Sequence, residues 1–402
     1  MRYSVLLPTR NGGQFLGNCI ESILSQEYDD FELVISDNAN SDATPAIVAE
    51  YRTHPKVRAI RLDEPVSVTD NWNAAYRASS GDYVLMMGDD DYLLPNYFRA
   101  MDALLERHAL PDCVLYNGFS FVAPGSISDD PRSYYSPDHF VFGRGFEREH
   151  ELSAEERRAV VHDMFRWKPR IPLNMQTTLV ARRAAERIAG GFFQPPFPDH
   201  YALNAMLVMG CRWVFSPERL VIVGVSPKSF GHYVYSGEQE SGLKYLGIDQ
   251  QFPGELPGSP LFNGKYIWLK RLLERFPREL AGEKIDRPGY VRRQVYNWIV
   301  QKRFGRISLG DLVRRFRLLS ARDWAGLCLT VFDRESWQRL RSMIARRGSV
   351  QAQWTRLQPL HGVPDIAAFA RFLEANGGAA GQTVSPAAVK ASSNRRANSS
   401  RE

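Results

Sequence analysis

The chain has 402 residues, which is enough for one large domain with a smaller one or for two domains of moderate size. Its 44% hydrophobic and 12% aromatic content is that of an ordinary globular protein with a buried core. The four cysteines lie far apart and form no CxxC pair, which argues against a disulfide framework or a zinc site and suits a reducing compartment.

The charge of the chain is unevenly distributed. The formal net charge is +6, yet residues 1–260 contain 24 basic and 34 acidic residues, while residues 261–350 contain 21 basic and 8 acidic ones. An acidic N-terminal part and a basic C-terminal part indicate two regions with different partners. The first apolar run is short and ends at Pro8, and no run approaches the roughly 20 apolar residues that span a bilayer. We therefore expect a soluble protein or one attached to a membrane surface.

Short apolar runs alternate with helical patterns through the first 122 residues. The predicted strands are 3–8, 31–36, 57–62, 82–87 and 113–122, and the predicted helices between them are 13–26, 42–54, 68–79 and 95–108. This alternation predicts right-handed βαβ units and an α/β fold with a mostly parallel sheet flanked by helices. Ligands of such sheets bind beyond the carboxyl ends of the strands. Three polar groups follow strand ends there and should converge on one rim: Pro8 to Asn11, Ser36 to Asn38, and Asp89 to Asp91.

The second part of the chain is less regular. Residues 125–170 are predicted to form a loop that acts as a lid or binds an acceptor. Helices are predicted at 181–190 and 199–210 and a strand at 213–226. The predicted division is a catalytic-type domain at 1–226, with halves 1–122 and 123–226, then a basic, mainly helical region at 227–373 and a disordered tail at 374–402.

The triplet Asp89, Asp90 and Asp91 directly follows a buried strand. Adjacent like charges raise one another's pKa unless something positive lies among them. The triplet is therefore either an exposed turn that opens the next helix or a seat for a hard cation such as Mg²⁺ or Mn²⁺, which prefer carboxylate oxygens. Asp37 poses a similar choice between an Asx turn and a carboxylate that accepts hydrogen bonds from a base or a ribose.

The order of these segments resembles a known family. The stretch "SVLLPTRNGGQFLGNCIESILSQEYDDFELVISDNANSD", followed by "SGDYVLMMGDDDYLLP", looks like the nucleotide-binding half of family 2 glycosyltransferases with the GT-A fold, over roughly residues 1–120. The resemblance implies that Pro8, Thr9, Arg10 and Asn11 line the nucleotide site and that Asp37 contacts the base. It also implies that the acidic motif holds Mn²⁺ or Mg²⁺ on the diphosphate of a nucleoside-diphosphate sugar.

The acidic motif departs from the family's usual Leu-Asp-x-Asp-Asp, since Gly88 occupies the position of the first Asp. By spacing, Asp91 and Asp89 are the expected metal ligands, because an extended turn points both the same way, and Asp90 is expected nearby at the diphosphate. Asn71, on the helix 68–79, is a further candidate for contact with the ribose or the diphosphate.

The family also needs a general base, which is an acidic residue opening a helix roughly a hundred residues past the metal motif. The segment "FFQPPFPDHYALNAML" places Asp199 there, although Pro198 replaces the acidic residue that often precedes it. An N-cap is the structural alternative for Asp199. His232 is a candidate metal ligand because members of this fold sometimes supply a late histidine, and a surface histidine is the alternative.

The basic back half alternates Arg with Leu, Val, Trp and Phe at helical spacing. Two interpretations stay open: a helical bundle with Arg outside, or peripheral contact with an anionic membrane. No nucleic-acid recognition motif accompanies the charge, so no nucleic-acid partner is expected.

The sequence thus predicts a metal-dependent, inverting glycosyltransferase. Its expected acceptor is a saccharide or lipid-linked hydroxyl in surface polysaccharide, lipopolysaccharide or glycolipid synthesis, and its expected place is the cytoplasm or the inner face of the plasma membrane. The alternatives are a non-catalytic nucleotide-sugar-binding protein and a nucleotidyltransferase of related fold. A dehydrogenase is disfavoured because no GxGxxG follows the first strand.

Overall fold

The structure is a computed structural model that describes residues 3–126, 131–143, 145–171, 173–227, 252–303, 305–329 and 357–377. The elements of the first part are β1 (Tyr3–Thr9), α1 (Leu16–Leu24), β2 (Phe31–Asp37), α2 (Thr44–Tyr51), β3 (Val57–Arg61), α3 (Val68–Ala78), β4 (Tyr83–Met86), β5 (Tyr92–Leu93), α4 (Tyr97–Arg107), β6 (Cys113–Val122), β7 (Ser133–Ser136), β8 (His150–Glu151), α5 (Ala154–Phe165), the 3-10 turn η1 (Met175–Thr177), β9 (Thr178–Ala181), α6 (Arg182–Ala185), α7 (Pro198–Val208) and β10 (Trp213–Val225). They are followed by α10 (Pro260–Arg275), α11 (Arg287–Arg303), α12 (Leu309–Phe316), α13 (Ala321–Leu329), β11 (Gln358–Leu360) and α15 (Ile366–Ala375).

One mixed sheet organises the first part of the chain. Its main path runs β11-β7-β6-β9-β4-β1-β2-β3, and β10 pairs with β5, β6 and β8 beside that path. Strands β4, β1, β2 and β3 are parallel, as are β6 and β10, whereas β9 lies antiparallel between β4 and β6. The predicted α/β fold with a mostly parallel, helix-flanked sheet is confirmed. Because β1, β2 and β4 are parallel neighbours, their carboxyl ends meet at one edge.

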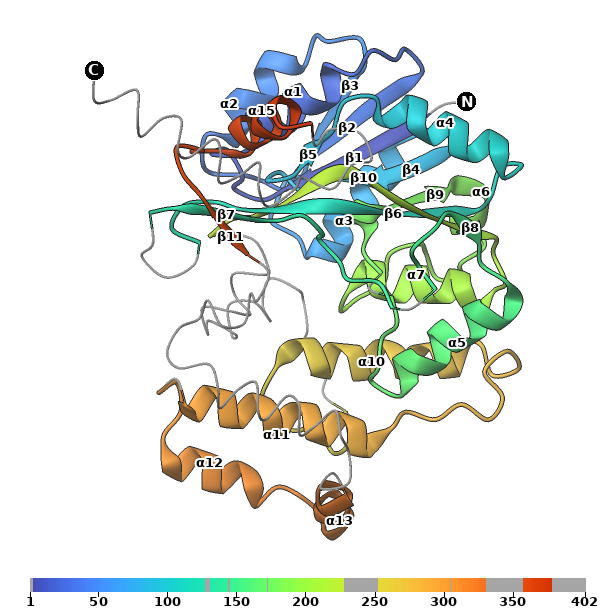
Figure 1. Ribbon diagram of the computed structural model, residues 1–402, viewed down its shortest axis with the longest axis vertical. Helices are drawn as coiled ribbons and strands as arrows, with labels where there is room; N and C mark the ends of the chain where they lie inside the picture. The colour runs from blue at the N-terminus through green and yellow to red at the C-terminus, as the bar shows by residue number, and fades with distance from the viewer. Residues whose placement is uncertain are drawn as a thin grey trace.

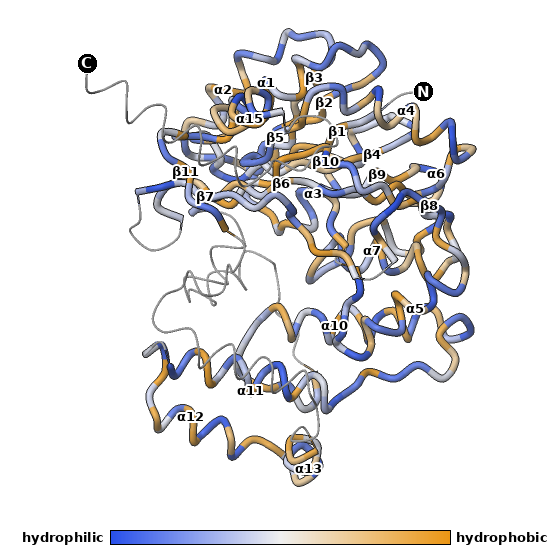
Figure 2. Tube along the Cα trace, viewed as in Figure 1, coloured by the Kyte–Doolittle hydropathy of each residue, from blue (hydrophilic) through white to orange (hydrophobic). Residues whose placement is uncertain are grey.

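Helices cover both faces of the sheet. Figure 1 shows α1, α2, α4 and α15 on one face and α3 and α7 on the other, with α10, α11 and α12 layered beyond α7. The inner strand β2 is buried throughout and β1 is buried except at Pro8, and both run through the upper part of Figure 2 as largely orange tube. A single large apolar cluster extends from these strands into α10 and α11, where Trp268 and Trp298 are buried. The helical C-terminal part therefore shares the core of the sheet domain.

The predicted strands and helices of residues 1–122 agree with the structure to within a few residues. Two segments differ. The predicted loop 125–170 contains the helix α5, which begins with a capping box between Ser153 and Glu156. The predicted helix 181–190 is helical only over α6: residue 181 is the last residue of β9, and residues 186–190 form turns. Gly190 and Gly191 both have positive φ, a backbone conformation that ends a helix.

The last described segment returns to the sheet. β11 pairs with β7 at the sheet edge, and α15 packs on the sheet beside α1. The domain boundaries at 226/227 and 373/374 stay predictions. The structure shows in addition that residues 358–375, which include β11 and α15, pack against the sheet. Among the described residues, no helix has the length and apolar character needed to cross a membrane.

Candidate functional site

The loops that follow β1 and β4 are in direct contact at the sheet edge. Thr9, the last residue of β1, donates its hydroxyl hydrogen to Asp89 Oδ2 at 2.7 Å. Gly12, three residues later, faces the same carboxylate, and a Cβ atom built on it would lie 1.9 Å from Asp89 Oδ2. Only a glycine lets the first loop approach Asp89 this closely. Gly12 is thus a site residue for which the sequence offered only a faint Gly-rich signal.

The loop after β2 is held by its own polar groups and by the first loop. Asp37 is buried; its Oδ1 accepts the Asn40 amide hydrogen at 2.8 Å and its Oδ2 pairs with Arg61 at 2.5 Å. Asp37 therefore makes the Asx turn that was one of its two predicted roles. In the first loop, Asn11 exchanges hydrogen bonds with Asn40 and Ser41. These contacts fix the two loops relative to each other.

Arg10 and Asn71 also connect elements at this rim. The Arg10 guanidinium donates to the carbonyl oxygens of Asn38 and Ala39. Asn71 on α3 is buried, and its Oδ1 accepts the Ser36 hydroxyl hydrogen at 2.6 Å. Pro8 is half-buried within β1, opposite Ser36 in the register. The structure thus gathers the predicted nucleotide-binding residues at one edge, each engaged in protein contacts.

The three consecutive aspartates have different surroundings. Asp91 is buried and points inward: its Oδ2 accepts the Gly88 amide hydrogen at 2.6 Å and its Oδ1 accepts the Gly224 amide hydrogen at 2.9 Å. Burial, followed by the nearby charge of Asp90, raises the pKa of the Asp91 carboxyl well above its usual range. Asp91 is therefore a structural anchor between the motif and β10, while Asp89 lies half-buried against the first loop.

Asp90 is the carboxylate with an unused oxygen. It accepts hydrogen bonds from Ser226, yet its Oδ2 is buried without a hydrogen-bond partner. Burial and the neighbouring charge of Asp89 raise its pKa to about 7. A buried, unpartnered carboxylate oxygen is costly unless a proton or a cation satisfies it.

The carboxylate oxygens of Asp89 and Asp90 are the kind of ligand that a hard divalent cation prefers. Within the described ranges no three His, Cys, Asp or Glu side chains converge into a complete metal cluster. Mg²⁺ and Mn²⁺ sites commonly use one or two carboxylates and complete the shell with phosphate and water. Asp90 and Asp89 offer that number, and the geometry favours Asp90 over Asp91 as the ligand because both Asp91 oxygens already bind backbone amides. His232, the candidate metal ligand, lies outside the described residues.

Asp199 occupies the first turn of α7 and is buried. Its Oδ1 accepts the amide hydrogen of His200 at 2.9 Å. The N-cap position of α7 is occupied by Phe197, which makes no side-chain cap hydrogen bond, so Asp199 is not the N-cap residue. The segment before α7 is tied to α3, because Asn73 Nδ2 donates to the Phe193 carbonyl at 3.0 Å. The helix terminus that carries Asp199 is therefore connected to the same helix that supports the β2 loop.

Comparison with known proteins agrees with this arrangement. The family model "Glycosyl transferase family 2" matches residues 4–184, which include the loops after β1, β2 and β4. Residues 4–184 are a family 2 glycosyltransferase domain. Its Asp37, Asp89 and Gly12 all lie within the matched range.

Proteins similar to this glycosyltransferase domain come from several bacteria. "Putative glycosyltransferase EpsE" of Bacillus subtilis (strain 168) is 30% identical over 27% of this chain and 39% of that protein. "Poly(ribitol-phosphate) beta-N-acetylglucosaminyltransferase TarS" of Staphylococcus aureus (strain Mu50 / ATCC 700699) is 26% identical over 27% of this chain and 19% of that protein. The crystal structure of S. aureus TarS 1-349 in complex with UDP-GlcNAc superimposes with a TM-score of 0.44 and 16% identity over 74% of this chain and 81% of that one. The matches thus cover less than half of these two curated relatives.

Replacing Gly12 with Ala should displace the Asp89 carboxylate and break its bond to Thr9, because the new methyl group would occupy the position of Asp89 Oδ2. We expect Mn²⁺ binding in the presence of UDP to weaken by roughly 10- to 100-fold with little change in melting temperature. Gly17→Ala in α1 is the matched control, since no atom lies within 4 Å of its added Cβ. It should leave binding unchanged and stabilise the helix by up to about 1 kcal/mol. Equal Mn²⁺ binding by both variants, measured by electron paramagnetic resonance, would contradict the placement of Asp89.

Asp90 should make the metal-free protein less stable as the pH rises. Its pKa is raised from 3.8 to about 7, so the folded state binds the proton of Asp90 more tightly than the unfolded state does. The free energy of unfolding therefore decreases as the pH rises from about 3.8 to about 7. Asp90→Asn should therefore raise the melting temperature at pH 8, by at least about 2 °C, and have a smaller effect at pH 5. The exposed Asp82 is the control, and Asp82→Asn should change neither value. A pH-independent effect of Asp90→Asn in thermal melts with chelator would argue against a buried, proton-binding Asp90.

Proposed function

We propose that the chain is a metal-dependent glycosyltransferase that moves a sugar from a nucleoside-diphosphate sugar to an acceptor hydroxyl. The observation that carries this proposal is the unpartnered, buried Asp90 oxygen beside Asp89, at the strand edge of a family 2 glycosyltransferase domain. A nucleotide base near Asp37 and a diphosphate near Asp89 and Asp90 would lie along the ends of β1, β2 and β4.

The metal would be Mn²⁺ or Mg²⁺, held by Asp90 and Asp89, and would supply neutralisation of the charge that develops on the leaving diphosphate. The chain's own contribution begins with Thr9 and Gly12, which fix the Asp89 carboxylate. Arg61 holds Asp37 in place, and its hydrogen-bonding N–H groups lie beside the proposed base site.

Asp199 would act as the general base. The acceptor hydroxyl gives its proton to the Asp199 carboxylate as its oxygen forms a bond to the anomeric carbon, and the bond from that carbon to the diphosphate oxygen breaks. Attack from the face opposite the diphosphate inverts the configuration at the anomeric carbon. The His200 amide, which donates to Asp199 Oδ1, keeps the carboxylate oriented through this step.

The acceptor we propose is a saccharide or lipid-linked hydroxyl of a bacterial cell-surface polymer. The name of TarS describes transfer of N-acetylglucosamine to poly(ribitol-phosphate), and that of another relative, from Campylobacter jejuni, describes a glucosyltransferase acting on an undecaprenol-linked glycan. Both names support a hydroxyl-bearing polymer or glycolipid as the acceptor.

The central test compares wild type and Asp199→Asn with Mn²⁺ and a panel of UDP-, GDP- and dTDP-sugars. Thermal shifts should identify one donor that both proteins bind equally, because Asp199 is not placed at the nucleotide. Release of nucleoside diphosphate in the presence of bacterial glycan acceptors should fall by about 10²- to 10⁴-fold in Asp199→Asn, the range for a lost general base.

The same assay separates the alternatives. Release of free pyrophosphate would indicate a nucleotidyltransferase. Donor binding without turnover in both proteins would indicate a nucleotide-sugar-binding protein. Failure of wild type to bind any donor with Mn²⁺ would contradict the proposed site itself.

We also propose that α12 and α13 contact an anionic membrane surface. Five of the eight large hydrophobic side chains that are exposed in the described part of the chain belong to these helices and the turn between them: Leu309, Val313, Leu318, Trp324 and Leu329. We call these five residues the α12–α13 face, and Figure 2 shows alternating orange and blue along α12. Exposed arginines occur along the same stretch of chain, from the end of α11 into α13, namely Arg303, Arg306, Arg314, Arg317 and Arg322.

The charge around this face is complementary to anionic lipid. Within residues 305–329, which the structure describes, the two acidic residues are both paired: Asp311 with Arg314, and the buried Asp323 with Arg287 at 3.0 Å. An apolar face rimmed by arginines lies at the boundary between headgroups and acyl chains, and each basic residue contributes about 1 kcal/mol near an anionic surface. Such a contact would bring the site to a lipid-linked acceptor.

Co-sedimentation with vesicles tests this contact. The protein should bind vesicles with about one third phosphatidylglycerol more tightly than pure phosphatidylcholine, and added salt should weaken binding. The double variant Leu318→Glu/Trp324→Glu should lose binding, whereas Val141→Glu, which alters an exposed apolar residue elsewhere, should keep it. Equal binding by the two variants would contradict the proposal, as would a change of oligomeric state in place of vesicle binding.

A further inference from the structure

We propose that β11 and α15, residues 358–375, form a C-terminal clasp that positions the acidic motif from the opposite side of β10. This inference rests on the proposed function, because it concerns the carboxylates that would hold the metal and diphosphate. It assigns a site-forming role to a segment that lies more than a hundred residues beyond β10 in the sequence.

The clasp is attached to the sheet edge by specific contacts. β11 pairs antiparallel with β7, with Leu360 opposite Ser133. The Ser133 hydroxyl donates to the Val363 carbonyl at 2.7 Å, and the Tyr135 hydroxyl donates to Gln358 Oε1 at 3.0 Å. These bonds place the start of α15 against the sheet and define its direction.

Phe369 is the centre of the clasp. It is fully buried, and its ring stacks on Phe121 at a centroid distance of 5.4 Å and contacts Tyr135 at 5.2 Å. The same apolar cluster contains Leu94 and Ile222. Leu94 lies three residues after Asp91, and Ile222 lies two residues before Gly224, so α15 packs directly behind both strands that frame the acidic motif.

β10 transmits this packing to the carboxylates. Ile222 pairs with Tyr92 in the β5–β10 ladder, and the Leu94 amide donates to the Leu220 carbonyl at 3.1 Å. Further along β10, the Gly224 amide binds Asp91. Ser226, directly beyond the strand, binds Asp90. A Cβ on Gly224 would lie 1.8 Å from the Asp90 carbonyl oxygen, so the strand runs in close contact with the motif's backbone.

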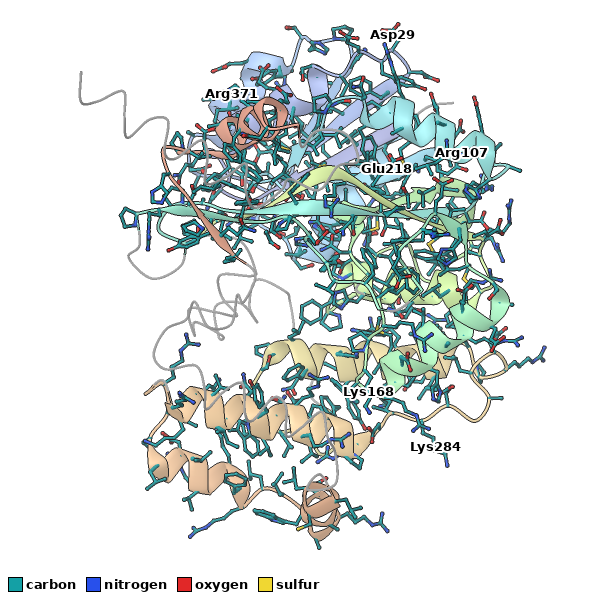
Figure 3. All side chains as sticks on the ribbon, viewed as in Figure 1. Asp29, Arg107, Lys168, Glu218, Lys284 and Arg371 are labelled. Carbon is teal, nitrogen blue, oxygen red and sulfur yellow. The ribbon has the colours of Figure 1, made fainter. Side chains whose placement is uncertain are left out.

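Charged residues of α15 also act near the motif. Burial raises the pKa of the Tyr92 hydroxyl. Of two charged residues on α15, Glu374 raises this pKa further and Arg371 lowers it. Arg371 is labelled in Figure 3 on the outer side of the sheet domain, on the helix next to α1. The neighbouring helix α1 also contacts β5, since Ser22 Oγ accepts the Leu93 amide hydrogen at 3.0 Å.

The clasp packs in a cluster separate from the main core. Phe369, Leu373 and Ile366 belong to a small group of buried residues, whereas β1, β2 and β4 belong to the large cluster. Loosening the clasp should therefore free the β5–β10 pair without unfolding the sheet. This separation distinguishes a positioning role from a contribution to overall stability.

The experiment compares Phe369→Ala, its conservative counterpart Phe369→Leu, and Leu272→Ala. Leu272 is equally buried but lies in α10, within the main cluster. Amide hydrogen exchange is measured on peptides covering 86–94 and 220–226, and Mn²⁺ affinity in the presence of UDP is measured by electron paramagnetic resonance. Phe369→Ala should accelerate exchange in these peptides and weaken Mn²⁺–UDP binding by roughly 10- to 100-fold, as loss of groups that orient metal ligands does.

Phe369→Leu should recover most of both losses, and Leu272→Ala should lower the melting temperature while leaving exchange of these peptides and Mn²⁺ affinity unchanged. Unchanged exchange in the two peptides of Phe369→Ala, or faster exchange with unchanged affinity, would overturn the inference. Where wild type does not bind Mn²⁺ with UDP, the same measurement is made with GDP and dTDP; absence of binding with all three would overturn the proposed function instead, and the exchange data would still decide whether the clasp orders the motif. Leu373→Ala makes the same comparison if Phe369→Ala does not fold.

Discussion

The repulsion among three consecutive carboxylates at the end of an apolar strand is the constraint around which this site is built. The fold resolves it by giving each aspartate a different environment. Asp91 turns inward onto two backbone amides, and Asp89 receives the Thr9 hydroxyl at the rim. Asp90 keeps one buried oxygen without a partner. Two carboxylates are thus stabilised by the protein, and one oxygen of the third is left to a proton or a cation.

Two close approaches to this motif are possible only because the approaching residues are glycines. Gly12 and Gly224 come from elements far apart in the sequence, yet each leaves space for an aspartate that a Cβ would displace. The amide of Gly224 also donates to Asp91, so this residue makes room for the Asp90 carbonyl oxygen and binds the next aspartate of the motif. Local geometry of the acidic loop therefore depends on β1 and β10 as much as on the loop's own residues.

The sequence predicted the rim but not the individual roles of its carboxylates. Buried strands with strong patterns, such as β1 and β2, made the convergence of Thr9, Asp37 and Asp89 predictable, because parallel strands end at one edge. The inward turn of Asp91 was not predictable, since its partner Gly224 lies on a strand 133 residues later. The clasp was missed for a related reason: α15 carries an ordinary amphipathic pattern, and nothing local indicates which surface covers Phe369.

The raised pKa of Asp90 connects the electrostatics of the free protein to ligand binding. A carboxyl group with a pKa of about 7 is partly protonated at neutral pH, which lowers the repulsion among the three aspartates. A cation must bind the deprotonated form, so its binding would release that proton and replace the missing hydrogen-bond partner of Oδ2. The close contact of Gly224 with the Asp90 backbone, and the clasp proposed behind β10, would hold this residue in place and keep its unpartnered oxygen available to the cation.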